Sequence, residues 1–158
     1  MEEQNQDRIT NSTWITRGDS AGLFNAKSET AFTQSVSPAG TRWAFSGLNG
    51  NPVDPDFSAA NYANLTFSPW RESLGGMGSL QTNIVNRPGV IHIVAEDIYV
   101  DILFSEWGSG GGGSFSYSRG SEPAAVPVES IPIAPVWVGA CLLLFTAIAA
   151  AANRTYGA

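Results

Sequence analysis

The sequence predicts a mainly β protein, an antiparallel β-sandwich of jelly-roll-like type followed by one C-terminal transmembrane helix. Three observations support this prediction. Charged residues make up only 14% of the chain, against about 25% in an average soluble domain, and turn-forming Gly, Ser, Asn and Pro are abundant. Residues 89–107 alternate in polarity with the period of two that strands show. Residues 133–152 form one uncharged apolar run.

The strand pattern is clearest in residues 89–107, GVIHIVAEDIYVDILFSEW. Every second residue from Ile98 to Phe104 is apolar, and these residues share one face of the predicted strand. Trp107 lies three positions after Phe104, so the same period of two places it on the opposite face of the strand. The glycine-rich residues 108–113 then predict a hairpin loop, because the segment lacks the Lys and the helix that a phosphate-binding loop needs. These glycines would also let another chain approach the backbone closely.

Further strands are predicted on both sides of this hairpin. Residues 114–118 alternate again and predict an antiparallel return strand. Weaker candidates, separated by turn signals, are Trp14–Arg17, Thr30–Val36, Arg42–Phe45 and Leu65–Trp70. We therefore divide the chain into a flexible N-terminal arm (1–8), a β-sandwich domain (9–120), a Pro-containing linker (121–132), a transmembrane helix (133–152) and a short tail (153–158).

The apolar run from Ile133 to Ala152 has the length of a membrane span, since twenty helical residues cover about 30 Å. Trp137 is placed as an interfacial aromatic residue, and Gly139 as a small residue that permits close packing against a partner helix. The single cysteine, Cys141, lies inside this run, so no intrachain disulfide can form. We interpret it as a small apolar helix residue rather than a lipidation site.

The orientation follows from the charges that flank this run. Arg154 follows it and Glu122 and Glu129 precede it, which places the C-terminus inside and the domain on the periplasmic or extracellular side. The first residues, MEEQNQDRIT, lack the features of a signal peptide. A processed start, another export route and a tail-anchored cytoplasmic domain therefore stay open as explanations.

Four aromatic residues are the main candidates for contact with a partner: Trp43, Tyr62, Trp70 and Trp107. Together they would form a stacking platform for sugars or for a protein. A position in the hydrophobic core is an equal interpretation for each of them. The Arg17-Gly18-Asp19 tripeptide matches an integrin-binding motif, which we treat as coincidence.

Charge and motif content argue against several function classes. The net charge of −6, with eight Lys and Arg residues, excludes a basic stripe for nucleic acid. His92 is the only histidine and no H-E-x-x-H motif occurs, so we expect neither a zinc site nor a catalytic triad. Asp54, Asp56, Asp97 and Asp101 suggest calcium at most, because they lack the EF-hand spacing. We expect no cofactor and no enzyme activity.

Several segments carry a resemblance: Asp7–Thr10, Trp14–Gly18, Gly22–Asn25, Ser37–Phe45, Asp97–Asp101 and Trp107–Arg119. Together they resemble an uncharacterised group of secreted bacterial β-domains found beside C-terminal sorting or anchoring segments. The resemblance covers most of residues 7–120, implies a bacterial origin and an extracytoplasmic site, and supplies no catalytic residues. The tail departs from a sorting signal, because its basic cluster is reduced to Arg154, and we therefore expect a retained anchor.

These observations predict a non-catalytic, single-pass accessory subunit in a bacterial cell membrane. Its β domain would dock on or bridge components of a larger membrane-protein complex. The alternative is a cell-surface adhesion or carbohydrate-binding module, and a hydrolase comes third. The expected partners are the lipid bilayer, membrane proteins and glycans, and no nucleic acid.

Overall fold

The computed structural model describes residues 5–54, 59–109 and 112–120. They lie in one compact unit, Met1–Pro127. The predicted transmembrane helix, with Trp137 and Gly139, lies outside the described residues, as do the linker and the tail. Within the part of the chain that the structure describes, no helix is long and apolar enough to span a bilayer.

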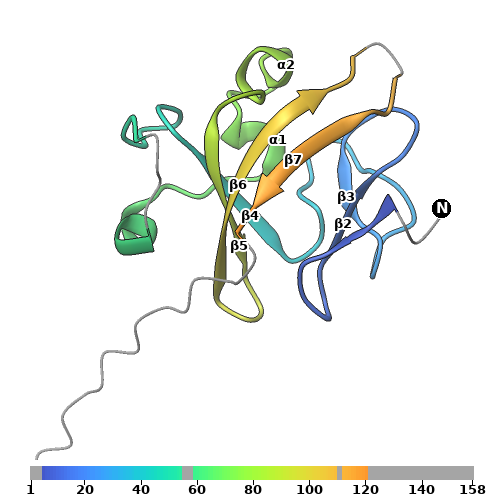
Figure 1. Ribbon diagram of the computed structural model, residues 1–158, viewed down its shortest axis with the longest axis horizontal. Helices are drawn as coiled ribbons and strands as arrows, with labels where there is room; N and C mark the ends of the chain where they lie inside the picture. Colours follow the sequence, from blue (N-terminus) through green and yellow to red (C-terminus); the bar gives the residue numbers. More distant parts are fainter. Residues whose placement is uncertain (1–4, 55–58, 110–111, 121–158) are drawn as a thin grey trace, which may run out of the picture. The chain divides into compact units, whose positions relative to one another are not determined.

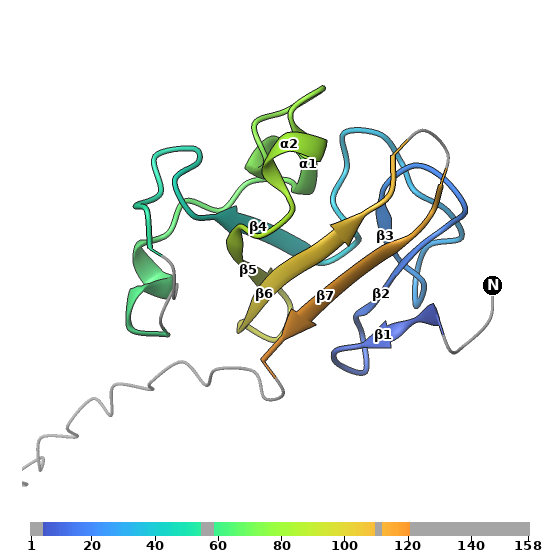
Figure 2. The ribbon, with the colours of Figure 1, turned by 45° about the horizontal axis from the view of Figure 1, so that its top comes forward.

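The described residues form two antiparallel sheets, which confirms the predicted mainly β class (Figures 1 and 2). The first sheet has the order β1 (Asp7–Arg8), β2 (Trp14–Arg17), β3 (Leu23–Asn25), and the second has the order β4 (Thr41–Phe45), β5 (Pro88–Ile93), β6 (Ile98–Trp107), β7 (Phe115–Arg119). Neighbouring strands in both sheets are consecutive in the chain. Hairpins connect β1 to β2, β2 to β3, β5 to β6 and β6 to β7, as local turn signals favour, whereas residues 46–87 separate β4 from β5.

The hairpins of the second sheet match the predicted pattern. Val100, Ile102 and Phe104 are buried, as the period of two requires. The pairing of β6 with β7 shifts register between Phe104 and Glu106, where a bulge interrupts the ladder. A bulge adds one residue to a strand, so Trp107 returns to the side of Phe104, and their ring centroids lie 6.0 Å apart. The prediction that Trp107 lies on the opposite face is therefore wrong.

Two weaker strand predictions are also wrong. Residues 30–36 form bends and turns, and Ser35 has a φ of 63°, which a strand does not accommodate. In the segment 65–70, only Ser68 pairs with another residue, in an isolated bridge to Trp43. The chain then enters the short helix α1 (Trp70–Ser73), directly after Pro69. A proline before the first helical turn favours this start, because its backbone needs no donor there.

The predicted flexible N-terminal arm contains residues that form a strand. Asp7 and Arg8 form β1, which pairs with Ile15 and Trp14 of β2. The carboxylate of Asp7 also receives hydrogen bonds from Arg119. These contacts order a segment whose polar composition alone predicts flexibility.

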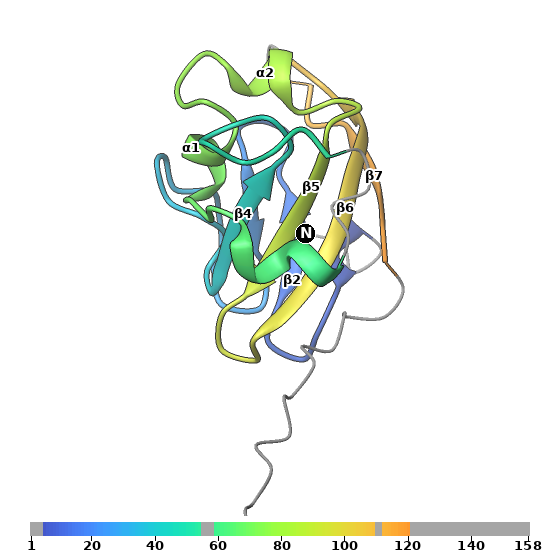
Figure 3. The same ribbon diagram turned by 90° about the vertical axis from the view of Figure 1, so that its left-hand side faces the viewer.

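One hydrophobic core draws on both sheets. It contains Ile15 and Leu23 of the first sheet together with residues of all strands β4–β6 and of the helical segment. Its centre is aromatic, with the rings of Trp43 and Trp70 packed edge to face at 4.7 Å. Two further short helices are the 3-10 helix η2 (Ala59–Asn64) and α2 (Leu80–Asn83). Both α-helices lie beside the end of the second sheet where β6 finishes (Figure 3).

Candidate functional site

The structure places most of the predicted aromatic contacts in the interior. Trp43 and Trp70 are 0% exposed and Tyr62 is 5% exposed. The indole nitrogen of Trp43 donates a hydrogen bond to the Thr41 hydroxyl at 2.9 Å, which satisfies its polar group inside the core. Trp107 is partly buried against the same core. An exposed stacking platform of all four residues therefore does not form.

Two of the four carboxylates suggested for calcium contact other side chains. Asp101 accepts a hydrogen bond from the Tyr62 hydroxyl at 2.6 Å, and Asp97 contacts the His92 ring nitrogen at 2.9 Å. Burial and the interaction with Asp101 raise the pKa of Tyr62. Asp56 lies outside the described residues. Among those described, no group of three or more His, Cys, Asp or Glu side chains is placed to hold a metal ion.

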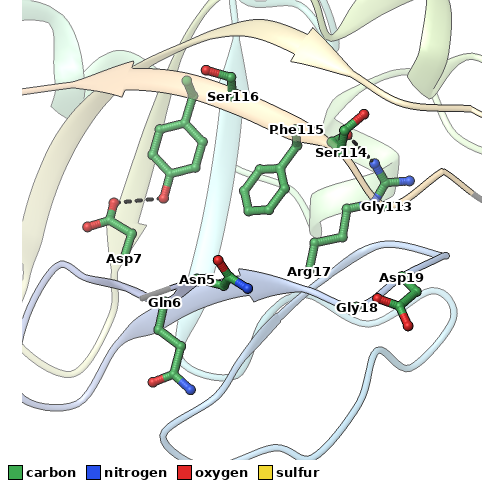
Figure 4. Close-up of a pocket in the computed structure, with 11 residues that line it drawn as sticks. Asn5, Gln6, Asp7, Arg17, Gly18, Asp19, Gly113, Ser114, Phe115 and Ser116 are labelled. Atoms are coloured by element: carbon green, nitrogen blue, oxygen red, sulfur yellow. Dashed lines mark hydrogen bonds between the residues drawn. The ribbon is translucent and has the colours of Figure 1, made fainter. Parts of the chain in front are cut away.

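A groove of about 810 Å³ opens between β1–β2 and β7 (Figure 4). We call it the inter-sheet groove. Its lining comes from three separate stretches of the chain, residues 5–7, 17–19 and 113–117. Two polar bridges, one at Asp7 and one at Arg17, join its walls. The groove is therefore a product of how the two sheets meet.

The first bridge is centred on Asp7. The Tyr117 hydroxyl donates to Oδ2 of Asp7 at 2.7 Å, while Nε and Nη2 of Arg119 donate to Oδ2 and Oδ1 at 2.8 and 2.9 Å. Burial of Asp7 raises its pKa, but the hydrogen bonds from Arg119 and Tyr117 outweigh burial and hold the pKa below its ordinary value. Burial and the same carboxylate raise the pKa of Tyr117. This bridge joins β1 to β7.

The second bridge is centred on Arg17, which is only 8% exposed. Its Nε, Nη1 and Nη2 atoms donate to the carbonyls of Ala21, Ser114 and Gly108 at 2.9, 2.8 and 2.9 Å. Its guanidinium lies over the Trp107 ring, 3.9 Å from the centroid. Burial lowers the pKa of Arg17. The arginine of the Arg17-Gly18-Asp19 tripeptide is thus occupied by internal contacts.

Gly113 brings the glycine-rich loop against the loop that follows β2. A Cβ atom at this position would lie 2.7 Å from the Cα of Asp19 and would also collide with the carbonyl oxygen of Gly18. Real Cβ atoms do not approach backbone so closely, so this contact requires glycine. The close backbone approach expected of the glycine run is present, and the approaching segment belongs to the same chain. It fixes one end of the inter-sheet groove.

The groove also presents two polar side chains and an aromatic ring to solvent. The side chains of Asn5 and Asp19 are exposed and have no hydrogen-bond partner among the described residues. The ring of Phe115 points into the groove from β7, with Asn5 across from it on the β1 side (Figure 4). An amide, a carboxylate and an aromatic face are therefore available together to a ligand.

Sequence reasoning missed these groove residues because its signals are local. Asp7 and Arg119 lie 112 positions apart in the chain, and neither belongs to a recognisable motif. Arg17 stood out only within a short tripeptide whose usual interpretation does not apply here. No protein-family model, curated protein or solved structure matches the chain. The geometry of the groove is thus the available guide to function.

Proposed function

We propose that the described β domain is a non-catalytic binding module whose inter-sheet groove binds a glycan. The observation that carries this proposal is the grouping of the unpartnered Asn5 amide, the unpartnered Asp19 carboxylate and the Phe115 ring in one open groove. Amide and carboxylate groups hydrogen-bond to sugar hydroxyls, and an aromatic face packs on the C–H face of a sugar ring. The groove volume of about 810 Å³ suits a short oligosaccharide.

The proposal gives the rest of the chain a role. The two sheets, which share one core, would pack as a sandwich. The uncharged run Ile133–Ala152 would anchor the domain as a single-pass membrane helix. With the domain on the periplasmic or extracellular side of a bacterial membrane, the groove would face the compartment that contains envelope and surface glycans. These parts of the proposal rest on the sequence pattern.

Docking of an accessory subunit onto a membrane complex is the second candidate. The specific observation that favours it is the position of β7 at the end of its sheet. The outer edge of such a strand presents backbone N–H and C=O groups to which a strand of a partner can add. Gly139 in the proposed anchor would permit a partner helix to approach. We place this candidate second because the free side chains in the groove match hydroxyl groups better than they match an apolar protein surface.

The test is titration of the full-length chain, in a non-ionic detergent, with an array of bacterial envelope oligosaccharides. Replacement of Asn5 by Ala should weaken binding by about five- to tenfold, since one lost hydrogen bond is worth about 1 kcal/mol. The matched control is Asn11→Ala, which removes an exposed amide outside the groove and should leave affinity unchanged. Calorimetry measures both affinities, and thermal unfolding confirms that both variants fold.

Two results would contradict the glycan proposal. One is equal affinity of the N5A variant, the N11A variant and the unaltered chain for every bound oligosaccharide. The other is no oligosaccharide binding together with recovery of a stoichiometric protein partner from native membranes. The second result would favour the accessory-subunit candidate.

A further inference from the structure

A second, smaller pocket lies beside the inter-sheet groove. Its volume is about 290 Å³. Its lining includes Arg71 of α1, Leu80 of α2, Trp107 at the end of β6 and Gly108, which follows β6. Arg17 lines both this pocket and the groove. We call the smaller cavity the arginine pocket.

The charge of the arginine pocket is opposite to that of the chain. The whole chain carries a net charge of −6 and only eight Lys and Arg residues. Two of these, Arg17 and Arg71, line one small pocket, and no Asp or Glu lines it. Like charges placed close together repel, and the repulsion is stronger where water is partly excluded. Such a pocket attracts an anion.

The contacts of Arg17 leave its charge uncompensated. Its three hydrogen bonds within the described residues go to backbone carbonyls, which are neutral acceptors. These bonds and the Trp107 ring hold the guanidinium in one position. Burial also lowers the pKa of Arg17, in keeping with an environment of neutral acceptors. Arg17 is therefore a fixed positive charge in the wall of the pocket.

Arg71 supplies the unused donors. Its Nε atom is buried, and within the part of the chain that the structure describes it has no hydrogen-bond acceptor. The recorded contact of its guanidinium is with the ring of Phe32, 5.7 Å from the centroid. Buried polar groups of folded proteins are almost always paired, so a guanidinium that lines a cavity and keeps an unpaired nitrogen points to a ligand acceptor. The planar guanidinium matches the geometry of carboxylate and phosphate oxygens.

We propose that the arginine pocket binds an oxyanion group, a carboxylate or a phosphate, through the free donors of Arg71 and the fixed charge of Arg17. The volume of about 290 Å³ admits such a group or a small anion that bears it, and is below the size of pockets that enclose larger ligands. The proposal stands independently of glycan binding in the inter-sheet groove, because none of its donors belongs to Asn5 or Asp19.

The experiment uses the full-length chain in a non-ionic detergent and titrates it with sodium phosphate and, separately, with sodium acetate. Ionic strength is held constant with sodium chloride, because non-specific charge effects depend on salt. The central variant is Arg71→Gln, which keeps a polar side chain and removes the charge. The matched control is Arg42→Gln, which makes the same charge change at an exposed arginine of β4. Thermal unfolding shows whether each variant remains folded.

The expected result is saturable binding of at least one anion, weakened about tenfold or more by R71Q and unchanged by R42Q. An additional R71K variant should bind with intermediate affinity, since it keeps the charge and loses the planar fork. Binding of phosphate alone or of acetate alone would identify the oxyanion class. Equal weakening by R71Q and R42Q would overturn the proposal, because the effect would then be one of net charge. Absence of saturable binding of both anions up to about 10 mM would also overturn it.

Discussion

At the scale of single residues, charged side chains rather than apolar ones join the two sheets beside the groove. Asp7 is 29% exposed and its partner Arg119 is 24% exposed, so the pair is partly shielded from water. Arg17 is almost fully buried. Ion pairs of this kind contribute more than exposed pairs, because less water screens them, and they also fix geometry. The shape of the inter-sheet groove therefore depends on a few polar contacts that single substitutions can remove.

Replacement of Asp7 by Asn should lower the free energy of unfolding by about 1–3 kcal/mol at neutral pH, because charge-assisted hydrogen bonds from Arg119 and Tyr117 are weakened. The pKa of Asp7 is below its ordinary value in the folded state. Its stabilisation is therefore complete above the pKa of the unfolded chain, about 3.9, and is lost as pH falls through the lower folded pKa. Chemical unfolding of the unaltered chain and of D7N across pH 2 to 7 measures the difference, with the range set by about these pKa values.

The difference between the two proteins is the informative quantity, because Asp101 acts in the opposite direction. Burial raises the pKa of Asp101 by more than the hydrogen bond from Tyr62 lowers it. The folded state therefore binds a proton at Asp101 more readily than the unfolded state, and acidification at this residue favours the folded state. This contribution is common to both proteins and cancels. Asp19→Asn is the control, since Asp19 makes no hydrogen bond to the described residues. A constant stability gap between D7N and the unaltered chain across the acid range would contradict the prediction.

At the scale of elements, local patterns predict those strands in which polar and apolar residues alternate over a long run. The two hairpins formed by β5, β6 and β7 follow from period-two alternation and a glycine-rich turn. The sequence also predicts β2 and β4. The short strands β1 and β3 have two and three residues, too few for a period to show. They exist because β2 pairs with both. The bulge in β6 is likewise set by pairing with β7 and reverses the face of Trp107.

Substitution of two neighbouring glycines tests whether the glycine-rich loop packs against the loop that follows β2. Gly113→Ala should destabilise the protein by about 1–3 kcal/mol, because the added Cβ collides with the backbone at Gly18 and Asp19. Gly112→Ala should change stability by no more than about 0.5 kcal/mol, since the nearest atom to its added Cβ, the carbonyl oxygen of Ser109, is 3.7 Å away. Chemical denaturation measures both. Equal stability of G113A and G112A would show that the two loops do not pack as described.

At the scale of the whole molecule, the site forms where segments far apart in sequence meet. Three stretches around residues 6, 18 and 115 line the groove, and no local pattern marks any of them as functional. Aromatic residues were the strongest sequence signal for a binding surface. In this fold Trp43 and Trp70 fill the core instead, because a small two-sheet domain needs large apolar side chains to bury enough surface. Composition thus predicts the fold class but not the position of the site.

The proposed membrane anchor, Ile133–Ala152, leads to a prediction about the whole chain. If Ile133–Ala152 spans a bilayer, the full-length chain should stay with membranes after alkaline carbonate extraction, since about twenty buried apolar residues make insertion effectively irreversible. A chain that ends at Gly120 should appear in the soluble fraction. A control with two arginines in place of Leu143 and Leu144 should also lose retention, because each charge at a helix centre costs about 2.5–3.5 kcal/mol. Immunoblots of the two fractions measure the outcome. Carbonate release of the unaltered chain would contradict a membrane-spanning anchor and would leave the groove of the β domain to act without one.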